Sequence, residues 1–493
     1  MKTALLSSLL ALLFVPQAFA SERPCAVCGA FYPADKKELS AAVDGYMKDA
    51  AKPAKPDGGV VGIMVPHAGY VFSARNAASA YLTLQDNYDT VVIFGSGHTK
   101  LTNGALAADE AYSTPLGTVQ VDGEALKKLL KAEPLVELDN EAHKSEHSIE
   151  VQLPFLQKVL KKPFKILPLT LNYAGPDSAP CIGAAVAAAV KGKKALFLLS
   201  TDLSHYPDKD IAPLSDRTML AAMETMDPVT VLLSNEILVS KRIPGLETAM
   251  CGASAAAAFL QAVKNAGADT AAALAYSNSA KSPMGEEKRV VGYGTMAFTS
   301  SRKKKKTFSL TEGQKKELLS AARRAIADEF SGKRPENRLS PNSAFNIPAA
   351  VFVTLTKDSN LRGCIGTTEP AGTLLDSVGY FARQAAFADH RFPPLGKSEL
   401  EKVKIEISIL TGPEPVSSGK EIKPGMHGVT VERDGHRGLF LPQVWKQLPD
   451  KESFLGELCS QKAGLERDCW KKKGTKLMVF EDYAFSESGE GGK

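Results

Sequence analysis

The chain has 493 residues, a length that predicts two or three domains rather than a single core. Its hydrophobic content of 44% and charged content of 23% are those of a globular protein. The net charge of +5 owes five positive charges to the one run RKKKK at 302–306, so the composition argues against a nucleic-acid-binding protein.

Residues 1–20 have the pattern of a secretory signal peptide. Lys2 precedes the apolar run 4–15, and Ala18 and Ala20 frame a cleavage site. A retained membrane anchor is the alternative, but the run is shorter than the roughly 20 residues that span a bilayer. No later stretch is long and apolar enough to span one. We therefore expect an exported protein, periplasmic or secreted, with no membrane span in the mature chain.

Export would place the seven cysteines in an oxidising compartment, where their odd number leaves at least one free or bound to metal. Cys25 and Cys28 form a C-x-x-C pair without the βαβ context of a thioredoxin motif. This context favours a local disulfide, or two idle thiols, over a redox role. The sequence leaves open whether Cys459 pairs with Cys469.

Residues 24–300 alternate apolar runs of strand length with helical patterns. This alternation predicts an α/β domain in which a mixed sheet is flanked by helices. The expected strands are 60–65, 90–95, 165–171, 195–200 and 290–298. The expected helices are 72–84, 149–161 and 252–266. In such sheets, functional sites form in the loops that follow the strands.

A polar, basic linker is predicted at 301–309, because this short segment separates two regimes of composition. A second domain of the α+β class is then expected over 310–487, and a helix at 311–330 opens it. Its expected strands are 349–357, 403–410 and 437–442, with long loops between them.

Three of the eight histidines, His67, His98 and His205, each follow an expected strand of the first domain. Histidine is the usual metal ligand and the usual general base near neutral pH. Asp202 lies three residues before His205 and could orient it or share its proton. Strands that belong to one sheet would bring the three histidines together, and this convergence favours a metal site.

His147 and Cys251 are two further candidates. His147 lies at the start of a helix, and Cys251 precedes an alanine-rich helix whose N-terminus would favour the thiolate. Each candidate also has a structural reading. A strand-end histidine is commonly a hydrogen-bonded structural residue, a cysteine beside alanines is commonly a small core residue, and the Asp202-x-x-His205 pair could cap a helix.

Several stretches of the sequence resemble two known families. Residues 24–300 resemble the Memo family, component B of the AmmeMemoRadiSam system, in CGAFYP (28–33), PHAGYVFSA (66–74), FGSGHT (94–99), EHSIEVQLPFL (146–156), TDLSHY (201–206) and MCG (250–252). The second domain resembles the AMMECR family, component A of the same system, in LRGCIG (361–366), AFADHRFPPL (386–395), MHGVTV (426–431) and LPQVW (441–445). The two components belong to one system, so a resemblance to either makes the other domain expected in the same chain.

The Memo fold is similar to that of the LigB-type extradiol dioxygenases, which hold a non-haem ferrous ion with two histidines and a carboxylate. The resemblance implies that His67, His98 and Cys251 are metal ligands, with the cysteine in place of the carboxylate. A soft thiolate favours iron, or alternatively copper, in a redox role over ring cleavage, and zinc is chemically possible. Thr99 stands where Memo sequences often carry a second histidine, which removes one extra ligand but spares this set.

The resemblance also implies catalytic residues. His205 falls where the dioxygenases place an acid/base histidine, Asp202 lies beside it, and His147 would line the pocket. We therefore expect an exported, metal-dependent redox protein, an oxidoreductase of dioxygenase-like ancestry that acts on an unknown small or modified substrate. A non-catalytic metal-binding or scaffold protein is the alternative. The name of the system implies a functional link to a radical-SAM protein.

In the second domain, Arg362 and Cys364 flank Gly363 and are the expected substrate-binding residues. Arginine beside a glycine turn suits an anionic ligand, and a thiol could act as a nucleophile or a metal ligand. The alternative is a turn shaped by glycine with Cys364 packed inside. The segment 389–391 could join this site. A hydrolase or transferase that depends on Cys364 is a weaker hypothesis, because no paired base is visible in the sequence.

Overall fold

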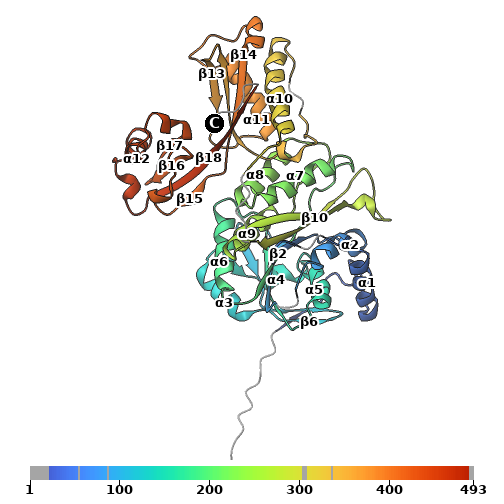
Figure 1. The fold of residues 1–493 in the computed structure, drawn as a ribbon. Coiled ribbons are helices and arrows are strands. Elements are labelled where there is room, and N and C mark those ends of the chain that lie inside the picture. The colour runs from blue at the N-terminus through green and yellow to red at the C-terminus, as the bar shows by residue number, and fades with distance from the viewer. Residues whose placement is uncertain (1–20, 54–55, 86–87, 302–307, 335–336, 488–493) are drawn as a thin grey trace, which may run out of the picture.

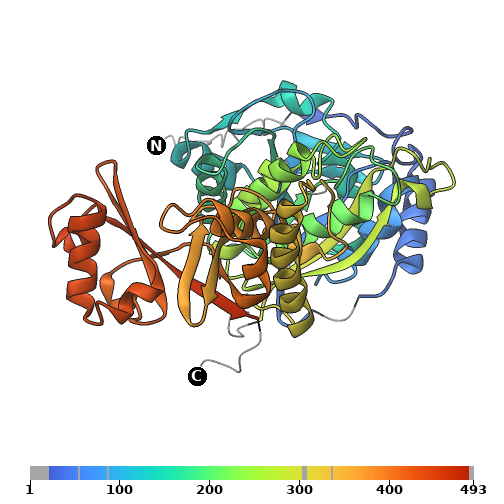
Figure 2. The same cartoon turned by 90° about the horizontal axis from the view of Figure 1, so that it is seen from above.

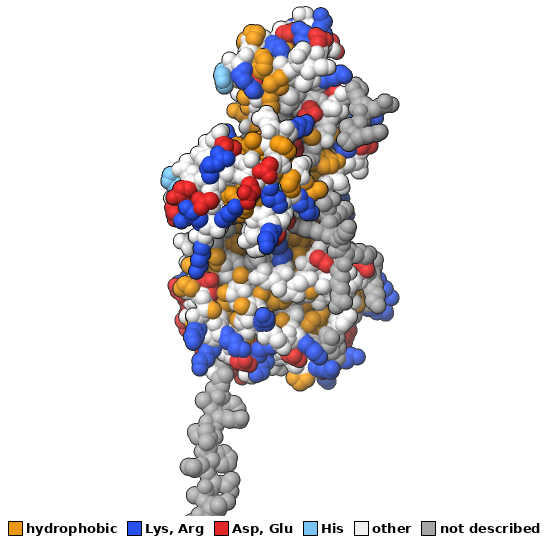
Figure 3. All heavy atoms as spheres, turned by 60° about the vertical axis from the view of Figure 1, so that its left-hand side comes forward, with side chains coloured by type: hydrophobic (Ala, Val, Ile, Leu, Met, Phe, Trp, Pro, Cys, Tyr) orange, Lys and Arg blue, Asp and Glu red, His pale blue; other side chains and the backbone are white. Residues whose placement is uncertain are grey.

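The computed structural model describes residues 21–53, 56–85, 88–301, 308–334 and 337–487, which form two domains (Figure 1). The predicted signal peptide and most of the predicted linker lie outside these ranges. Within the described ranges, no helix is both long enough and apolar enough to cross a membrane. On the face drawn in Figure 3, basic and acidic side chains are interspersed rather than gathered by sign.

The first domain contains an eight-stranded mixed sheet. In spatial order its strands are β10 (Thr270–Asn278), β11 (Gly292–Ser300), β2 (Gly59–Val65), β9 (Ala195–Ser200), β3 (Thr90–Ser96), β8 (Lys165–Leu171), β4 (Ala105–Ala107) and β7 (Val136–Leu138). The central strands β2, β9, β3 and β8 are parallel, whereas β10 and β11 are antiparallel to their neighbours. A three-stranded sheet comprises β1 (Glu22–Arg23), β5 (Ala111–Thr114) and β6 (Gly117–Val119).

Helices cover both faces of the large sheet, as the sequence predicts. One face packs on α1 (Lys36–Asp49), α2 (Tyr70–Tyr81) and α5 (Leu153–Val159). The other packs on α3 (Gly123–Ala132), α6 (Ser178–Ala189), α7 (Ala212–Glu224), α8 (Pro228–Ser240) and α9 (Ala253–Asn265). The short helix α4 (Asn140–Lys144) follows β7. Because side chains alternate along a strand, Ile63 and Val65 of β2 pack in the core under α1, α2 and α5, and Met64 packs in the core on the opposite face of the sheet.

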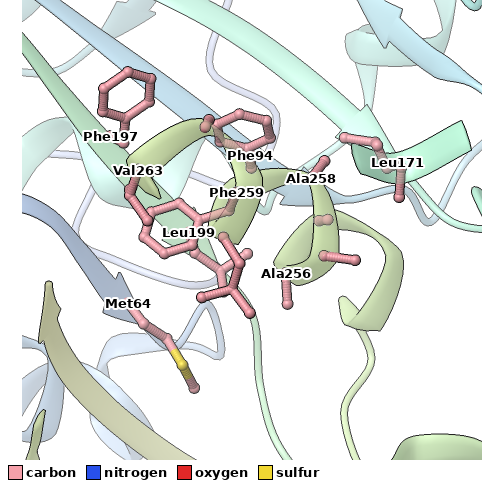
Figure 4. Packing of buried hydrophobic residues seen from close by; sticks show 14 of the residues in the cluster. Met64, Phe94, Leu171, Phe197, Leu199, Ala256, Ala258, Phe259 and Val263 are labelled. Carbon is pink, nitrogen blue, oxygen red and sulfur yellow. The ribbon is translucent and has the colours of Figure 1, made fainter. Parts of the chain in front are cut away.

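Helix α9 is the centre of the larger core. Figure 4 shows Phe259 of this helix among strand residues that include Phe94, and its ring also lies edge-on to Phe298, 4.8 Å between centroids. Helix α6 approaches α9 closely, since a Cβ on Gly183 would lie 2.1 Å from the carbonyl oxygen of Ala258. Small residues on both helices permit this contact, and α9 in turn fixes the loop that precedes it.

The second domain is an α+β domain with a seven-stranded antiparallel sheet. In spatial order its strands are β13 (Asn360–Gly366), β12 (Ala350–Lys357), β14 (Val403–Leu410), β18 (Lys476–Ser486), β16 (His427–Arg433) and β17 (His436–Phe440), and β15 (Glu414–Val416) also pairs with β18. Helices α10 (Glu312–Phe330) and α11 (Leu374–Phe387) pack on β12 and β14. A second lobe around α12 (Lys451–Glu457) has its own core and projects to one side (Figures 1 and 2).

Two features differ in detail from the sequence prediction. The expected helix 149–161 is divided into a 3-10 turn, Glu150–Gln152, and α5, whose second residue is a proline. Strand β18 has no counterpart among the predicted strands, yet it joins the two lobes, because its residues 482–486 pair with β14 and its residues 476–481 pair with β16.

Direct polar contacts join the two domains. The Lys241 ammonium lies 2.6 Å from the Asp376 carboxylate, and the lysine side chain is only 8% exposed. Asn346 of the second domain donates to the hydroxyl of Thr218 at 3.1 Å. The domains are therefore joined by specific contacts as well as by the segment 301–309.

Candidate metal centre

The site lies where three adjacent parallel strands of the first domain end. Val65 of β2 and Gly95 of β3 both pair with Ser200 of β9, so the three strands reach the same edge of the sheet in register. His67 and His98 follow β2 and β3 by two residues each, and the loop after β9 begins with Thr201. The ends of these neighbouring strands bring His67 and His98 together as predicted, whereas His205 is not part of the histidine cluster that forms there.

Three imidazole rings meet at this edge: His67, His98 and His147 each offer a nitrogen, and these atoms lie within 4.8 Å of one another. The rings of His98 and His147 stack, with 4.5 Å between centroids. The ring of His67 stands edge-on to both, at 5.2 and 5.3 Å. His147, expected to line the pocket, therefore offers its nitrogen alongside the two predicted histidine ligands.

His67 is held with one nitrogen turned toward the site. Its Nδ1 lies 3.3 Å from the hydroxyl of Ser200, which already donates its own hydrogen to the carbonyl of Ser148. The hydroxyl must therefore accept from Nδ1–H of His67, which leaves Nε2 as the nitrogen that a metal could bind. That Nε2 lies 3.5 Å from the sulfur of Cys251.

Glu146 organises the other two histidines. Its carboxylate accepts from Nδ1 of His98 at 2.9 Å and from the backbone N–H groups of His98, His147 and Ser148 at 2.6 to 2.9 Å. These bonds and the His98 charge outweigh burial and hold the pKa of Glu146 well below its usual range. An ionised carboxylate can only accept, so Nδ1 of His98 donates to it, and Nε2 is the nitrogen of His98 that a metal could bind once its proton is released.

Cys251 sits two residues before α9, in a cluster of polar groups. The backbone N–H of Asp202 points to its sulfur at 3.3 Å, and the hydroxyls of Ser96 and Thr201 lie at 3.3 and 3.5 Å. Gly252 allows this packing, since a Cβ there would lie 2.6 Å from the Ser96 hydroxyl. The sulfur is thus directed at His67 by its surroundings.

The charged groups of this cluster stabilise a thiolate at Cys251 and a positive charge on His67. Burial raises the pKa of Cys251, but His67 and His98 outweigh burial and hold it well below its ordinary value. Burial lowers the pKa of His67, yet Asp202 and Cys251 raise it to about 9. Burial and the same two histidines lower the pKa of His147 to about 4. A metal cation would supply the positive charge that protons otherwise supply here.

The three imidazoles of the cluster, with the Cys251 sulfur 3.5 Å from Nε2 of His67, form a donor set that suits iron, copper or zinc. Ser200 and Glu146 supply the outer hydrogen bonds that metal-binding histidines usually have. The residues therefore fit a transition-metal ion.

The predicted pairing of Asp202 with His205 needs correction. Asp202 accepts a hydrogen bond from the backbone N–H of His67 at 2.8 Å, and its other oxygen lies 4.0 Å from Nε2 of His67. His205 instead donates from Nδ1 to the carbonyl of Leu203 at 3.0 Å, which leaves its Nε2 free. Asp202 thus supports the position of His67, and the backbone orients His205.

In the second domain, the predicted residues are already engaged. The Arg362 guanidinium lies 3.1 Å from the Glu399 carboxylate, which also binds Lys357 at 2.9 Å. The backbone of Cys364 donates to Asp389 at 2.9 Å and accepts from Arg391 at 3.0 Å. Asp389 and Arg391 do join this region, as the sequence suggested they could.

A separate hollow of about 530 Å³ in the second domain is bordered by the motif residues Met426, Pro442 and Trp445, together with Glu481 and Asp482. It lies at neither Cys364 nor the histidine cluster.

Sequence reasoning overlooked Glu146 and the hydroxyls of Ser96, Ser200 and Thr201. Glu146 directly precedes His147, so a carboxylate next to a candidate histidine was a visible signal. The serines and threonine gave no such signal, because these residue types end many strands.

Comparison with known proteins agrees with both domains. Residues 23–297 match the family model described as Memo-like protein, and residues 319–485 match AMMECR1. A MEMO1 family protein of Aquifex aeolicus is 35% identical over 281 residues, which are 56% of this chain and 98% of that protein. One of Nitrosopumilus maritimus is 33% identical over 277 residues, 55% of this chain and 98% of that protein.

Among solved structures, the uncharacterized protein PH0010 of Pyrococcus horikoshii is 35% identical, with a TM-score of 0.33, over 36% of this chain and 94% of that one. The family model and the curated relatives together cover more than half of the chain. The chain belongs to the Memo-like protein family, and its Memo-like domain is followed by an AMMECR1 domain.

Proposed function

We propose that the Memo-like domain is a metal-dependent redox centre with His67, His98 and Cys251 as ligands. The observation that carries this proposal is the orientation of the two histidines. Both have Nδ1 engaged by an outer partner, which leaves Nε2 as the nitrogen that could bind a metal, and Nε2 of His67 lies 3.5 Å from the Cys251 sulfur. His147 is the remaining donor within reach.

Iron is the proposed metal, with copper or zinc as alternatives, because one thiolate among imidazoles suits all three. The bound ion would supply Lewis acidity and, for iron or copper, one-electron chemistry. The residues around it hold the ligands: Asp202 fixes the backbone of His67, and Glu146 fixes His98. His205, with Nε2 free, is the proposed acid/base group that accepts or gives a proton at the substrate.

The first test is metal content, measured by mass spectrometry on the purified protein. We expect near-stoichiometric iron or copper in the wild type and loss of metal in His67→Ala and Cys251→Ala. Cys181→Ser is the matched control, since Cys181 is also a free cysteine but lies exposed on α6. No metal in the wild type, or metal unchanged in the two ligand variants, would sink the proposal.

The second test separates an oxidoreductase from a non-catalytic metal-binding or scaffold protein. His205→Ala should retain metal, since His205 lies outside the three-histidine cluster. If oxygen uptake or substrate turnover is lost in this variant while metal stays bound, the enzyme proposal is supported. If the metal-loaded wild type shows no oxygen uptake at all, metal binding without turnover is the better description.

Export and a functional link to a radical-SAM protein remain part of the proposal. Two cysteine pairs, Cys25–Cys28 and Cys459–Cys469, are disulfide-bonded, and such bonds persist in oxidising compartments. An N-terminus at Ser21 in a periplasmic fraction, read by mass spectrometry, would support export. A cytoplasmic chain that retains Met1 would contradict it.

A further inference from the structure

The two disulfides differ in their surroundings. Cys459 and Cys469 are 0% and 1% exposed, and they lie in the core of the second lobe with Phe454 and Leu455. Cys25 and Cys28 are only three positions apart and both partly exposed, although Cys28 also packs against the edge of a buried cluster. Buried disulfides resist exchange because a thiolate must reach one of the two sulfur atoms. Only the N-terminal bond offers that access.

A hollow of about 590 Å³ opens onto this bond. Cys25 and Cys28 line it together with Pro24 on one side, and Ser113 and Pro115 at the end of β5 on the other. Glu22 is the one charged side chain in the lining, and its carboxylate accepts from the hydroxyl of Thr118 at 2.7 Å. A small thiol can therefore approach the sulfur atoms along a largely uncharged wall.

The loop around the disulfide is held by other bonds. Glu150, fully buried, accepts from the backbone N–H groups of Ala26 and Val27 at 2.7 and 3.0 Å and from the Tyr32 hydroxyl at 2.6 Å. Arg23 neutralises that carboxylate at 2.7 Å. A disulfide that closes so short a loop also constrains the unfolded chain less than a disulfide that closes a longer loop. The fold of this loop thus does not depend on the sulfur–sulfur bond.

We propose that Cys25–Cys28 is a thiol–disulfide exchange site for an external dithiol. A thiolate of the dithiol attacks one of the two sulfur atoms, the bond between Cys25 and Cys28 breaks, and a mixed disulfide forms. The released cysteine takes a proton. The second thiol of the dithiol then attacks the sulfur that its first thiol contributed to the mixed disulfide. The bond to the protein breaks, the second cysteine leaves and takes a proton, and the dithiol is released as a disulfide. Two electrons and two protons pass to the protein, and the dithiol is oxidised.

The loop that carries this exchange site contacts the histidine cluster. The loop that follows Cys28 carries Phe31, whose ring lies edge-on to His147 at 5.0 Å, and the carbonyl of Phe31 accepts from the backbone of Tyr70 at 2.8 Å. The disulfide loop is therefore one wall of the candidate metal centre. The exchange itself does not rest on the metal proposal, and it can be tested on the protein with or without metal.

The experiment follows reduction of the native protein by dithiothreitol, with alkylation at timed intervals and peptide mapping by mass spectrometry. Cys459–Cys469 in the same molecule is the internal control. We expect Cys25–Cys28 to be reduced at least tenfold faster than Cys459–Cys469, without change in far-ultraviolet circular dichroism. The double variant Cys25→Ser with Cys28→Ser should remain folded, and the fast gain of two thiols per chain should disappear.

Three results would overturn the proposal. The first is free thiols at Cys25 and Cys28 in the protein as purified under oxidising conditions. The second is reduction of both disulfides at the same rate. The third is loss of circular dichroism in step with reduction of Cys25–Cys28, which would make this bond a structural one.

Discussion

The polar clusters of the two domains differ in what they leave unpaired. In the Memo-like domain, outer partners occupy Nδ1 of His67 and His98, and Nε2 of His67 faces the Cys251 sulfur. In the AMMECR1 domain, Arg362 is paired with Glu399, and Asp389 is paired with Arg391 at 2.7 Å. The first cluster retains donor atoms for a ligand, whereas the charged side chains of the second are paired with one another. Chemically suggestive residues thus indicate a site only where their partners leave atoms free.

A variant of the first-domain core, Phe259→Ala, should have the greatest effect on stability, and it tests whether the two domains are separate folding units. Phe259→Ala removes a fully buried ring from the first-domain core and should lower the free energy of unfolding by about 3–5 kcal/mol. Urea unfolding followed by circular dichroism measures this loss. Both tryptophans, Trp445 and Trp470, lie in the second domain, so the transition seen by tryptophan fluorescence should stay in place.

Phe454→Ala is the matched variant, because Phe454 is also fully buried and stacks on Trp445 with 3.7 Å between centroids. It should shift the fluorescence transition. If both variants shift both transitions equally, the domains unfold as one unit, and the contrast between them loses its thermodynamic basis.

A second prediction concerns Asp216, a fully buried carboxyl on α7. Burial raises the pKa of Asp216 to about 6, although Tyr276 and the backbone of Ser204 donate to it. The protonated form is favoured in the folded chain, so this contribution to stability is complete below the ordinary aspartate pKa of about 4 and is lost as pH rises through about 6. The raised pKa thus contributes about 3 kcal/mol to the free energy of unfolding at low pH.

Asp216→Asn should flatten that part of the pH profile, which urea unfolding at pH 4, 5, 6 and 7 can measure. The difference in unfolding free energy between wild type and variant should therefore change with pH in this window. Equal slopes for the two proteins would show that Asp216 titrates normally and would contradict the inferred cause.

A third prediction concerns the outer partner of His98. Glu146→Gln replaces an ionised acceptor with a neutral amide and should weaken metal binding by about 10- to 100-fold. Competition with a chelator of known affinity measures this change. Glu141→Gln is the control, since Glu141 lies nearby in the sequence with its side chain 83% exposed. Equal affinities for the two variants would remove Glu146 from the site.

The smallest effect is expected in the second domain. Glu399→Gln removes a charge from a partly exposed pair with Arg362 and should change the free energy of unfolding by about 1 kcal/mol or less. The fluorescence-detected urea midpoint measures it. If this variant instead allows an anion such as inorganic phosphate to bind, detected by calorimetry, Arg362 serves a ligand site and the contrast between the clusters is weaker.

Much of the fold was predictable because the central strands are continuous apolar runs. Residues 60–65, 90–95 and 195–200 are buried on both faces over most of their length, and their ends place His67, His98 and the loop to His205 without further information. Strand β18 was missed because its identity depends on two non-local pairings, with β14 and with β16, rather than on its own pattern.

The two families, the mixed sheet and the histidines at its edge follow from the amino-acid sequence alone, because hydrophobic periodicity and local motifs carry that information. The folded structure was needed to show that Nδ1 of His67 and of His98 is engaged, that Asp202 supports His67 rather than His205, and that Glu146 organises His98 and His147. It also decided that one disulfide is exposed and the other buried. Hydrogen-bond partners and burial depend on residues far apart in the chain, and no local pattern encodes them.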